Sequence, residues 1–331
     1  MKQLLVILDG ALPQEMESLP SLSSAPYRWQ CCHTPPGWMP DSLCCILSIL
    51  GVAPWYIPAG RAFLEALAAG MEPEKEDLAF RCNRVLWEKG RLLSAQGPES
   101  DLKGLEKSLT QAGLSWTSLG GYKGLLLAKG KAELLPFLET FPPHDHVGEP
   151  MVPFLPQCPG ALGSLLKRLL LQWGLWPWGQ AVFSPLPAFE ALHGFSGGAV
   201  CRTEAVRGMA LAMGMECPFL PHATADWDTD LEEKGNLALS LLNRHSFVML
   251  HLNGGDECAH RRDQQEKDFF FQRVDRQLLA FLVSQVSCDL CLTVTADHGT
   301  SGQTGRHTAG PVLCCRFGPE RCRGNREMIL S

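Results

Sequence analysis

Hydrophobic residues gather into short runs along this chain, and longer segments with helical periodicity lie between the runs. The runs LLVILDG, HSFVMLHLNG and LCLTVTADHG predict buried β-strands that end in polar, glycine-containing turns. Helical character is clearest in SLCCILSIL and in EKDFFFQRVDRQLLAFLVSQV. In the second of these segments, apolar residues recur at three- and four-residue spacing, as an amphipathic helix requires: Phe270, Val274, Leu278 and Phe281.

The alternation of strands and helices predicts an α/β fold with a mostly parallel sheet sandwiched by helices. Ligands of such sheets collect at the carboxyl ends of the strands. Asp9, Asp256 and Asp297 all fall at the ends of predicted strands. These three carboxylates are therefore the first candidates for a functional site.

The middle of the chain follows a less regular pattern. Short segments such as GYKGLLLAKGK and the proline-rich TFPPHDHVGEPMVPFLPQCPG replace the strand–helix alternation. We interpret residues 78–182 as a second, smaller α/β domain inserted into the first. Residues 1–77 and 183–331 then form the core domain.

Composition is that of a globular protein with a sizeable core, because 45% of the 331 residues are hydrophobic and 19% are charged. The net charge of -6 argues against non-specific nucleic-acid binding, which needs a basic surface. No apolar run approaches the roughly 20 residues that span a bilayer. The start, MKQLLVILDG, fits a first strand better than a signal peptide.

The chain contains fourteen cysteines, and several pairs of them lie in apolar runs where they behave as small hydrophobes. These are Cys31, Cys32, Cys44, Cys45, Cys314 and Cys315. Cys288 and Cys291 form a CxxC without a second pair at metal spacing, so a strand is favoured there over a zinc or redox site. We expect a reducing cytoplasm as the compartment.

Ionisable residues at the predicted strand ends form a set that suits metal binding. The set consists of Asp9, Asp256, His260, Asp297, His298 and His307. Three aspartates and three histidines supply mixed oxygen and nitrogen ligands for two divalent cations such as manganese or zinc. Asp256 and His260 stand four apart, so both can lie on one face of a helical turn. Each piece alone fits a turn or a solvated helix start, but their combination favours a metal site.

Ser42, in GWMPDSLCCILSILG, precedes an apolar helical run. A serine in this place is by default a helix N-cap, and the local pattern favours that role. The same place also offers backbone N–H groups and a positive helix end to a phosphate. A paired-cation site suits phosphoryl transfer, for which Ser42 is the candidate nucleophile.

Motifs in a fixed order along most of the chain carry a resemblance to a known family. They are ILDG, PDS before an apolar helix, GRAFLEALAAG, DLAFRCN, WPWGQ, LPAF, GMALAMGM, DTDLEEK, HLNGGDECAHRRDQQEK and TADHGT with a downstream histidine. With these motifs the chain resembles the archaeal-type, 2,3-bisphosphoglycerate-independent phosphoglycerate mutases of the alkaline phosphatase superfamily. The resemblance implies an alkaline-phosphatase-like core with an inserted cap domain.

The resemblance also implies roles for individual residues. Ser42 would be the transiently phosphorylated nucleophile. One metal would be bound by Asp9, Ser42, Asp297 and His298, and the other by Asp256, His260 and His307, with a flexible GTSGQTGR linker reaching both. Candidates for binding the substrate's phosphate or carboxylate are Arg61, Arg81, Asn83 and, as a catalytic residue, Lys234. Asp145 would orient the acceptor hydroxyl, whereas Glu65 is expected in a helical salt bridge.

The cations implied are two divalent ions, Mn²⁺ first, with Mg²⁺, Zn²⁺ or Co²⁺ as alternatives. The partner implied is a small phosphorylated hydroxyacid, with no nucleic acid and no membrane, and the oligomeric state stays open. The chain departs from the family in a shorter inserted domain, in GTSGQTG without the usual proline, and in TAGPV without an acidic residue. A metal-dependent phosphatase or phosphodiesterase, a homoserine-directed phosphotransferase and a non-catalytic relative therefore remain alternatives to the mutase.

Overall fold

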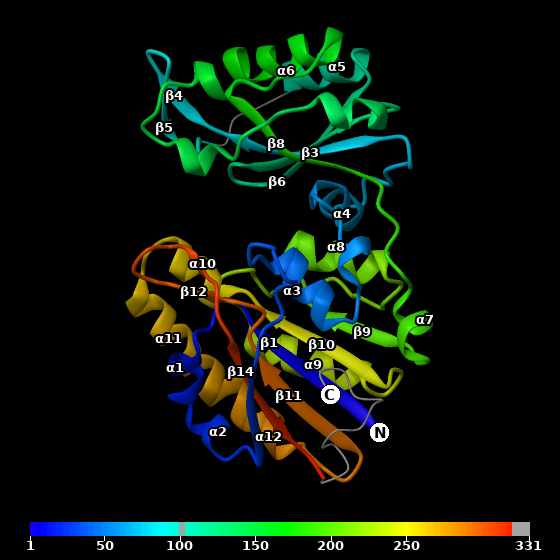
Figure 1. The fold of residues 1–331 in the computed structure, drawn as a ribbon, viewed down its shortest axis with the longest axis vertical. Coiled ribbons are helices and arrows are strands. Elements are labelled where there is room, and N and C mark those ends of the chain that lie inside the picture. The colour runs from blue at the N-terminus through cyan, green and yellow to red at the C-terminus, as the bar shows by residue number, and fades with distance from the viewer. Residues whose placement is uncertain (99–102, 320–331) are drawn as a thin grey trace. The chain divides into compact units, whose positions relative to one another are not determined.

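The larger sheet of the protein has six strands and is mainly parallel, as the strand–helix alternation predicted (Figure 1). A computed structural model describes residues 1–98 and 103–319 of the chain. The sheet consists of β1 (Lys2–Leu8), β2 (Tyr27–Cys31), β9 (Gly197–Val200), β10 (Phe247–Leu252), β11 (Leu290–Thr295) and β14 (Val312–Phe317). Their order is β2-β14-β11-β1-β10-β9, and β14 alone runs opposite to the other strands, because it pairs antiparallel with both β11 and β2.

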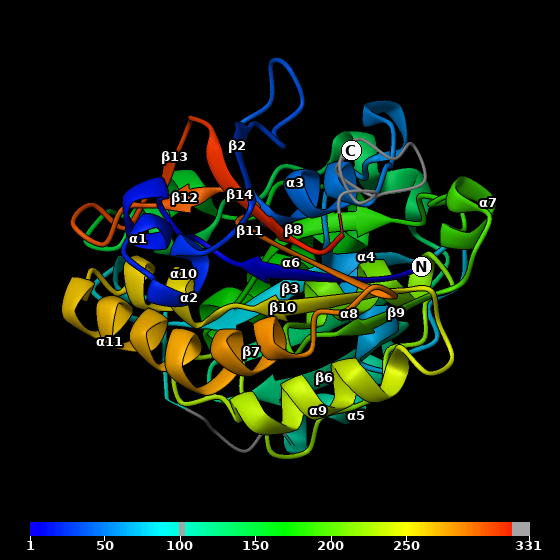
Figure 2. The ribbon, with the colours of Figure 1, turned by 90° about the horizontal axis from the view of Figure 1, so that it is seen from below.

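Alternate side chains of β1 supply both faces of the sheet with core residues. Leu4, Val6 and Leu8 join one hydrophobic cluster that includes Leu241 and Phe270 from the covering helices. Helices α9 and α11 lie on this face and α3 lies on the other (Figure 2). The helices of this unit are α1 (Pro13–Glu17), α2 (Pro20–Ser23), α3 (Ser42–Ile49), η1 (Pro54–Tyr56), α7 (Phe189–His193), α8 (Glu204–Ala212), α9 (Leu231–Leu241), α10 (Gly254–His260), α11 (Gln264–Val274), η5 (Asp275–Leu279) and α12 (Ala280–Ser284).

The long helical segment from Gln264 to Ser284 departs from the expected periodicity near its end. Phe270, Val274 and Leu278 are buried as predicted, but Phe281 is 39% exposed and Leu282 is buried instead. The segment contains a π-helical turn, η5 (Asp275–Leu279). Because such a turn holds more residues than an α-helical one, it rotates the following side chains about the helix axis. The expectation for Phe281 is therefore wrong.

Residues Pro58–Pro185 form a second compact unit, while Met1–Ile57 and Leu186–Ser331 form the first. The segment 78–182, which the sequence predicted as an inserted domain, lies within this unit, and the unit begins earlier. Its antiparallel sheet, in the order β6-β7-β3-β8, consists of β3 (Leu78–Arg84), β6 (Leu114–Gly120), β7 (Lys123–Ala128) and β8 (Leu175–Val182). Its other elements are α4 (Ala62–Ala68), β4 (Leu86–Glu88), β5 (Arg91–Ser94), α5 (Lys103–Gln111), η2 (Ala132–Phe137), η3 (Pro143–His146), η4 (Val152–Phe154) and α6 (Gly160–Trp173).

Helix α4 explains why the second unit starts before residue 78. Its apolar side chains Phe63 and Ala66 pack against Ala79 and Leu127 of the antiparallel sheet. The opposite face of that sheet packs against α5 and α6. None of the helices in residues 1–98 and 103–319 is long and apolar enough to cross a membrane.

Candidate metal centre

The ends of three parallel strands bring the predicted ligands together. Asp9 follows β1, Asp256 and His260 lie on α10 directly after β10, and Asp297 and His298 follow β11. Two triads have ligand atoms that lie within 4.8 Å of one another, namely Asp9, Asp256 and His298, and then Asp256, His260 and His307. Asp256 belongs to both triads, so the two clusters are adjacent and share one carboxylate.

A glycine allows β1 and α10 to approach this closely. Gly10 has a φ of +74°, and a Cβ placed on it would lie 2.8 Å from the Cα of Asp256. A larger residue would therefore be strained and would push Asp256 away from Asp9. The DG dipeptide that ends the first strand is thus needed for the geometry of the site.

His307 reaches the centre on a short β-hairpin rather than on a flexible linker. β12 (Gly299–Thr300) pairs with β13 (His307–Thr308), with Thr300 opposite His307. The imidazole rings of His298 and His307 consequently lie with their centroids 4.1 Å apart. The expected flexibility of GTSGQTGR is not what the structure shows, because cross-strand hydrogen bonds hold its ends together.

Ser42 is the first residue of α3, and the structure corrects its expected role as N-cap. Asp41 is the N-cap, and its carboxylate accepts a 2.7 Å hydrogen bond from the backbone N–H of Cys44. The Ser42 side chain is thereby left for the site. Its Oγ lies 3.2 Å from His298 Nε2 and 3.5 Å from Asp9 Oδ2.

Hydrogen bonds orient all three histidines in the same way. Each Nδ1 has an acceptor: Gly305 O for His260 at 2.9 Å, Pro40 O for His307 at 2.7 Å, and Thr300 Oγ1 for His298 at 3.3 Å. A carbonyl oxygen only accepts, and the Thr300 hydroxyl already donates to Asp256 Oδ1 at 2.6 Å, so we assign the Nδ1 proton in each ring. Each Nε2 then points toward the centre and is the atom that a cation would bind, which is how metal-binding histidines are held.

The carboxylates show that these residues fit divalent cations. Among the described residues no donor reaches Asp9 Oδ1 or either side-chain oxygen of Asp297, although all three atoms are buried. Burial, followed by the charges of Asp297 and Asp256, raises the pKa of Asp9 well above its usual range. Buried carboxylates without donors are costly unless a cation compensates them.

The second triad has the same character. Its two imidazole nitrogens, His260 Nε2 and His307 Nε2, lie 3.2 Å apart. Hydrogen bonding to Asp256 raises the pKa of His260 to about 9. Burial opposes the ionisation of Asp256, but the hydrogen bond and charge of His260 outweigh it and lower the pKa of Asp256 below its usual range. A proton on His260 therefore takes the place that a cation between these groups would fill.

Three polar residues that support the centre were missed in the sequence. His251, on β10, is fully buried and lies 3.0 Å from Asp9 Oδ2, and burial lowers its pKa to about 4, so the neutral ring donates to Asp9. Lys267 is also buried and donates to the carbonyl oxygens of Gly10 and Thr300. The sequence could have indicated His251, because this histidine stands inside an apolar run that predicts a strand. The sequence pattern gave no indication of the roles of Thr300 and Lys267.

Lys234 lies on α9 and is 1% exposed. Its Nζ is 3.5 Å from the carbonyl oxygen of His251, the residue that donates to Asp9. Burial lowers the pKa of Lys234 to about 8. The sequence predicted this lysine as a phosphate ligand, and the structure places it beside the strand that leads into the centre.

The remaining predicted substrate ligands belong to the second unit. Arg61 and Arg81 both bind the carboxylate of Glu65, at 3.1 and 3.0 Å, which confirms the helical salt bridge expected for Glu65. Asn83 is buried; its amide donates to Ala95 O and accepts from Trp178 Nε1. The carboxylate of Asp145 is 62% exposed on η3 and lies 3.7 Å from His144. Their roles in substrate binding stay predictions.

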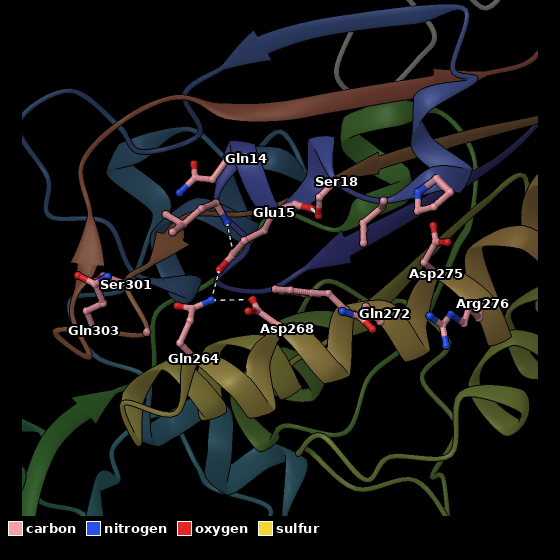
Figure 3. A pocket seen from close by; sticks show the side chains of 15 residues that line it. Gln14, Glu15, Ser18, Gln264, Asp268, Gln272, Asp275, Arg276, Ser301 and Gln303 are labelled. Carbon is pink, nitrogen blue, oxygen red and sulfur yellow. Dashed lines mark hydrogen bonds between the residues drawn. The ribbon is translucent and has the colours of Figure 1, made fainter.

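A cavity of about 1030 Å³ lies elsewhere on the first unit (Figure 3). It runs between α1 and α11, where the amide of Gln264 donates to Glu15 and Asp268 at 3.0 and 2.8 Å. Among the described residues that line it, none belongs to the predicted metal ligands. The metal centre is therefore identified by its donor atoms and not by the volume of a cavity.

Known proteins share both the sequence pattern and the fold. The model of a family described as the Metalloenzyme superfamily matches residues 34–328. A protein of Methanothermobacter thermautotrophicus named 2,3-bisphosphoglycerate-independent phosphoglycerate mutase 2 is 26% identical, over 94% of this chain and 84% of its own length. A Methanosarcina acetivorans protein named 2,3-bisphosphoglycerate-independent phosphoglycerate mutase is also 26% identical, over 84% of this chain and 77% of its own.

Two solved structures resemble the whole molecule. The PH0037 protein from Pyrococcus horikoshii has a TM-score of 0.69 at 22% identity and covers 96% of this chain and 87% of its own. A cofactor-independent phosphoglycerate mutase from Thermoplasma acidophilum has a TM-score of 0.55 at 18% identity, with coverages of 96% and 90%. At these identities the likeness shows a shared fold.

Proposed function

The chain belongs to the Metalloenzyme superfamily, and we propose that it interconverts 2-phosphoglycerate and 3-phosphoglycerate through a phosphoserine at Ser42. One observation carries this proposal: the Ser42 hydroxyl lies within 3.5 Å of Asp9 and His298, at the edge of two ligand triads that share Asp256. The names of the relatives support the substrate class, a small phosphorylated hydroxyacid.

We propose that Asp9, Ser42, Asp297 and His298 hold one divalent cation. Asp256, His260 and His307 hold the other, and Mn²⁺ is the first choice because it accepts carboxylate and imidazole ligands together. When bound, the two ions would offset the negative charge that develops on the phosphoryl group during its transfer. The donor-free oxygens of Asp9 and Asp297 and the aligned Nε2 atoms of the histidines support this assignment.

The chain's own residues then perform the transfer in two steps. Ser42 Oγ attacks the phosphorus of 3-phosphoglycerate, a bond from Oγ to phosphorus forms, and the bond from phosphorus to the 3-oxygen breaks. Asp9 Oδ2 is an acceptor within reach of the hydroxyl proton, and Asp9 Oδ1 and His298 Nε2 are left to hold the cation. The 3-oxygen takes up the proton that Ser42 gave up. The 2-hydroxyl of the retained glycerate then attacks the phosphoserine: a bond from the 2-oxygen to phosphorus forms, the bond from phosphorus to Oγ breaks, and the proton of the 2-hydroxyl passes to Oγ, which restores Ser42. Lys234 is proposed to bind the phosphate.

An assay that follows three products tests this function. Purified protein with Mn²⁺ is given 3-phosphoglycerate, a panel of other phosphorylated hydroxyacids, and homoserine with ATP. We expect 2-phosphoglycerate as the main product. Release of inorganic phosphate in its place would identify a phosphatase, and phosphohomoserine would identify a homoserine-directed phosphotransferase. Turnover of none of these substrates by the metal-loaded protein would contradict an enzymatic role in this class. The capping role of the second unit stays a prediction.

Replacing His307 by alanine is expected to weaken one of the two metal sites selectively. The variant removes an Nε2 from the triad of Asp256 and His260 and leaves Asp9, Asp297 and His298 unchanged. Burial lowers the pKa of His307, so the ring is a neutral ligand near pH 7. Metal content after dialysis, measured by inductively coupled plasma mass spectrometry, should fall from two ions per chain to one. Unchanged occupancy would remove His307 from the ligand set.

Replacing Lys234 by methionine is expected to raise stability and to lower activity. Burying the charge of this lysine costs stability below pH 8, since its pKa is about 8 in the folded chain against the ordinary lysine value of 10.5. Methionine should therefore stabilise the protein by on the order of 2 to 3 kcal/mol at pH 7. This gain should disappear as the pH rises from 8 toward 10.5, because the unfolded lysine then loses its proton too.

Thermal unfolding from pH 7 to pH 10 measures the first effect, and turnover measures the second. A drop in turnover of about 100-fold with a higher melting temperature would assign Lys234 to charge stabilisation in the reaction. Full activity in a stabilised variant would remove Lys234 from the site.

We propose the cytoplasm as the compartment, because buried thiols such as Cys44, Cys45 and Cys315 pack as small apolar groups.

A further inference from the structure

A second group of metal-binding side chains lies at the antiparallel edge of the central sheet. Cys31 ends β2, His33 follows it, and Cys314 lies on the adjacent β14. Cys31 Sγ lies 3.0 Å from Cys314 Sγ and 3.3 Å from His33 Nε2, and the three ligand atoms lie within 4.8 Å of one another. None of the three residues belongs to the ligand set of the proposed metal centre.

The site is built into the sheet and still has an outer opening. Cys314 is completely buried and His33 is 9% exposed, whereas Cys31 is only partly buried. The buried hydroxyl of Thr295 closes the inner side, 3.0 Å from Cys314 Sγ and 3.4 Å from His33 Nε2. An ion can therefore enter past the partly exposed Cys31 and bind two sulfur atoms and one imidazole nitrogen.

The register of the strands disfavours a disulfide between the two cysteines. Cys31 lies opposite Val312 and Trp29 lies opposite Cys314, so the two cysteines are diagonal neighbours. Diagonal neighbours in an antiparallel pair have Cα atoms about 7 to 8 Å apart. An unstrained disulfide needs about 4.4 to 6.8 Å. An ion between the sulfurs spans the longer distance without moving the backbone.

The protonation of the two thiols also suits a cation. The two sulfurs lie 3.0 Å apart and share one hydrogen bond, in which either thiol can be the donor. The thiolate is the form that binds metals. A bound ion takes the place of the shared proton, and the thiol protons leave to solvent.

We propose that Cys31, His33 and Cys314 bind a zinc ion, as a third metal site separate from the proposed phosphoryl-transfer centre. Thiolate and imidazole ligands select zinc over the oxygen-preferring cations of that centre. With Zn–S bonds of about 2.3 Å, the sulfurs of a tetrahedral site stand about 3.8 Å apart, so they need to separate by less than an ångström. The fourth position faces the Thr295 hydroxyl or a water molecule.

Occupancy of this site links the edge strand β2 to β14, and the Thr295 hydroxyl connects the cluster to β11. Thr295 is the last residue of β11 and precedes Asp297 by two positions. Its hydroxyl also donates to the carbonyl oxygen of Leu313 on β14. Zinc bound here therefore cross-links β2 and β14 at the edge of the sheet, and we expect it to raise the melting temperature.

Cadmium absorption tests the proposal, because only thiolate ligands give a charge-transfer band in the ultraviolet with this ion. The full chain is first saturated with Mn²⁺, and Cd²⁺ is then titrated. We expect a thiolate band that saturates at one ion per chain and that added Zn²⁺ removes. Cys31→Ser and Cys314→Ser should lose the band, and His33→Gln should weaken Cd²⁺ binding by at least about 10-fold. Cys32→Ser is the matched control, because Cys32 is exposed and lies outside the cluster.

The outcomes separate this site from other thiols and from a disulfide. Absence of the band in the wild-type chain overturns the proposal, as does a band that survives in Cys31→Ser or disappears in Cys32→Ser. A loss of two hydrogens in the mass of the Cys31–Cys314 peptide pair under mild oxidation, with no cadmium band, would show a redox pair instead. Zinc competition in the wild-type chain requires no variant, so the test stands even where a serine variant folds poorly.

Discussion

Replacing Ser42 by alanine is expected to abolish phosphoryl transfer, by about 10⁴-fold or more, while the protein stays folded. Removal of a catalytic nucleophile lowers turnover by a factor of this size, because the covalent route is lost and only binding and charge stabilisation remain. Ser42 Oγ is the hydroxyl that lies within 3.5 Å of both Asp9 and His298. Helix α3 should be unaffected, since its N-cap is Asp41.

The measurement combines turnover of 3-phosphoglycerate, circular dichroism and mass spectrometry of the trapped phosphoserine. Ser48→Ala on the same helix is the matched control and should keep full activity. Asp41→Ala should instead cost about 0.5 to 2 kcal/mol of stability, because it removes the hydrogen bond to Cys44. Near-normal turnover in Ser42→Ala would show that no phosphoserine is formed on this residue.

Replacing Asp256 by asparagine is expected to remove metal from both clusters and to reduce activity at least as strongly as His307→Ala does. Asp256 is the one residue present in both triads. Its Oδ2 lies 3.2 Å from His260 Nε2, and its Oδ1 lies 3.8 Å from His307 Nε2. Asparagine keeps the size of the side chain but supplies one neutral oxygen in place of a shared carboxylate.

Manganese content of the Mn²⁺-loaded chain after dialysis should fall below one ion per chain in Asp256→Asn, against two in the wild type. Asp268→Asn is a suitable control, because this carboxylate of α11 contacts Gln264 and no member of the triads. It should retain both ions. Two ions in Asp256→Asn would mean that the clusters do not share this carboxylate, and would contradict the geometry on which the proposed function rests.

The fold was predictable as far as it depends on local patterns. β1, β10 and β11 are continuous apolar runs, because parallel strands in this sheet are covered on both faces. The exposure of Phe281 was not predictable, since the π-turn η5 rotates the helix without leaving a mark in the apolar spacing. The start of the second unit at Pro58 likewise depends on which sheet α4 packs against.

Parts of the candidate site were open to prediction for a similar reason. Asp9, Asp256 and Asp297 follow strands, and strand ends of a parallel sheet meet at one edge. The local pattern favoured Ser42 as an N-cap because it shows only that a helix starts there, and Asp41 and Ser42 are both suitable caps. The hydrogen bond from Cys44 to Asp41 settles the choice in the folded chain.

The sequence by itself determined the α/β class, and it predicted the strand ends and the candidate ligand residues that meet there, because periodicity and residue chemistry are local properties. Only the tertiary structure decided that Asp256 belongs to both triads, that His251 and Thr300 orient their neighbours, and that Cys31 meets Cys314. These relations join residues far apart in the chain. They depend on strand order and register, which hydrophobic spacing along one strand does not specify.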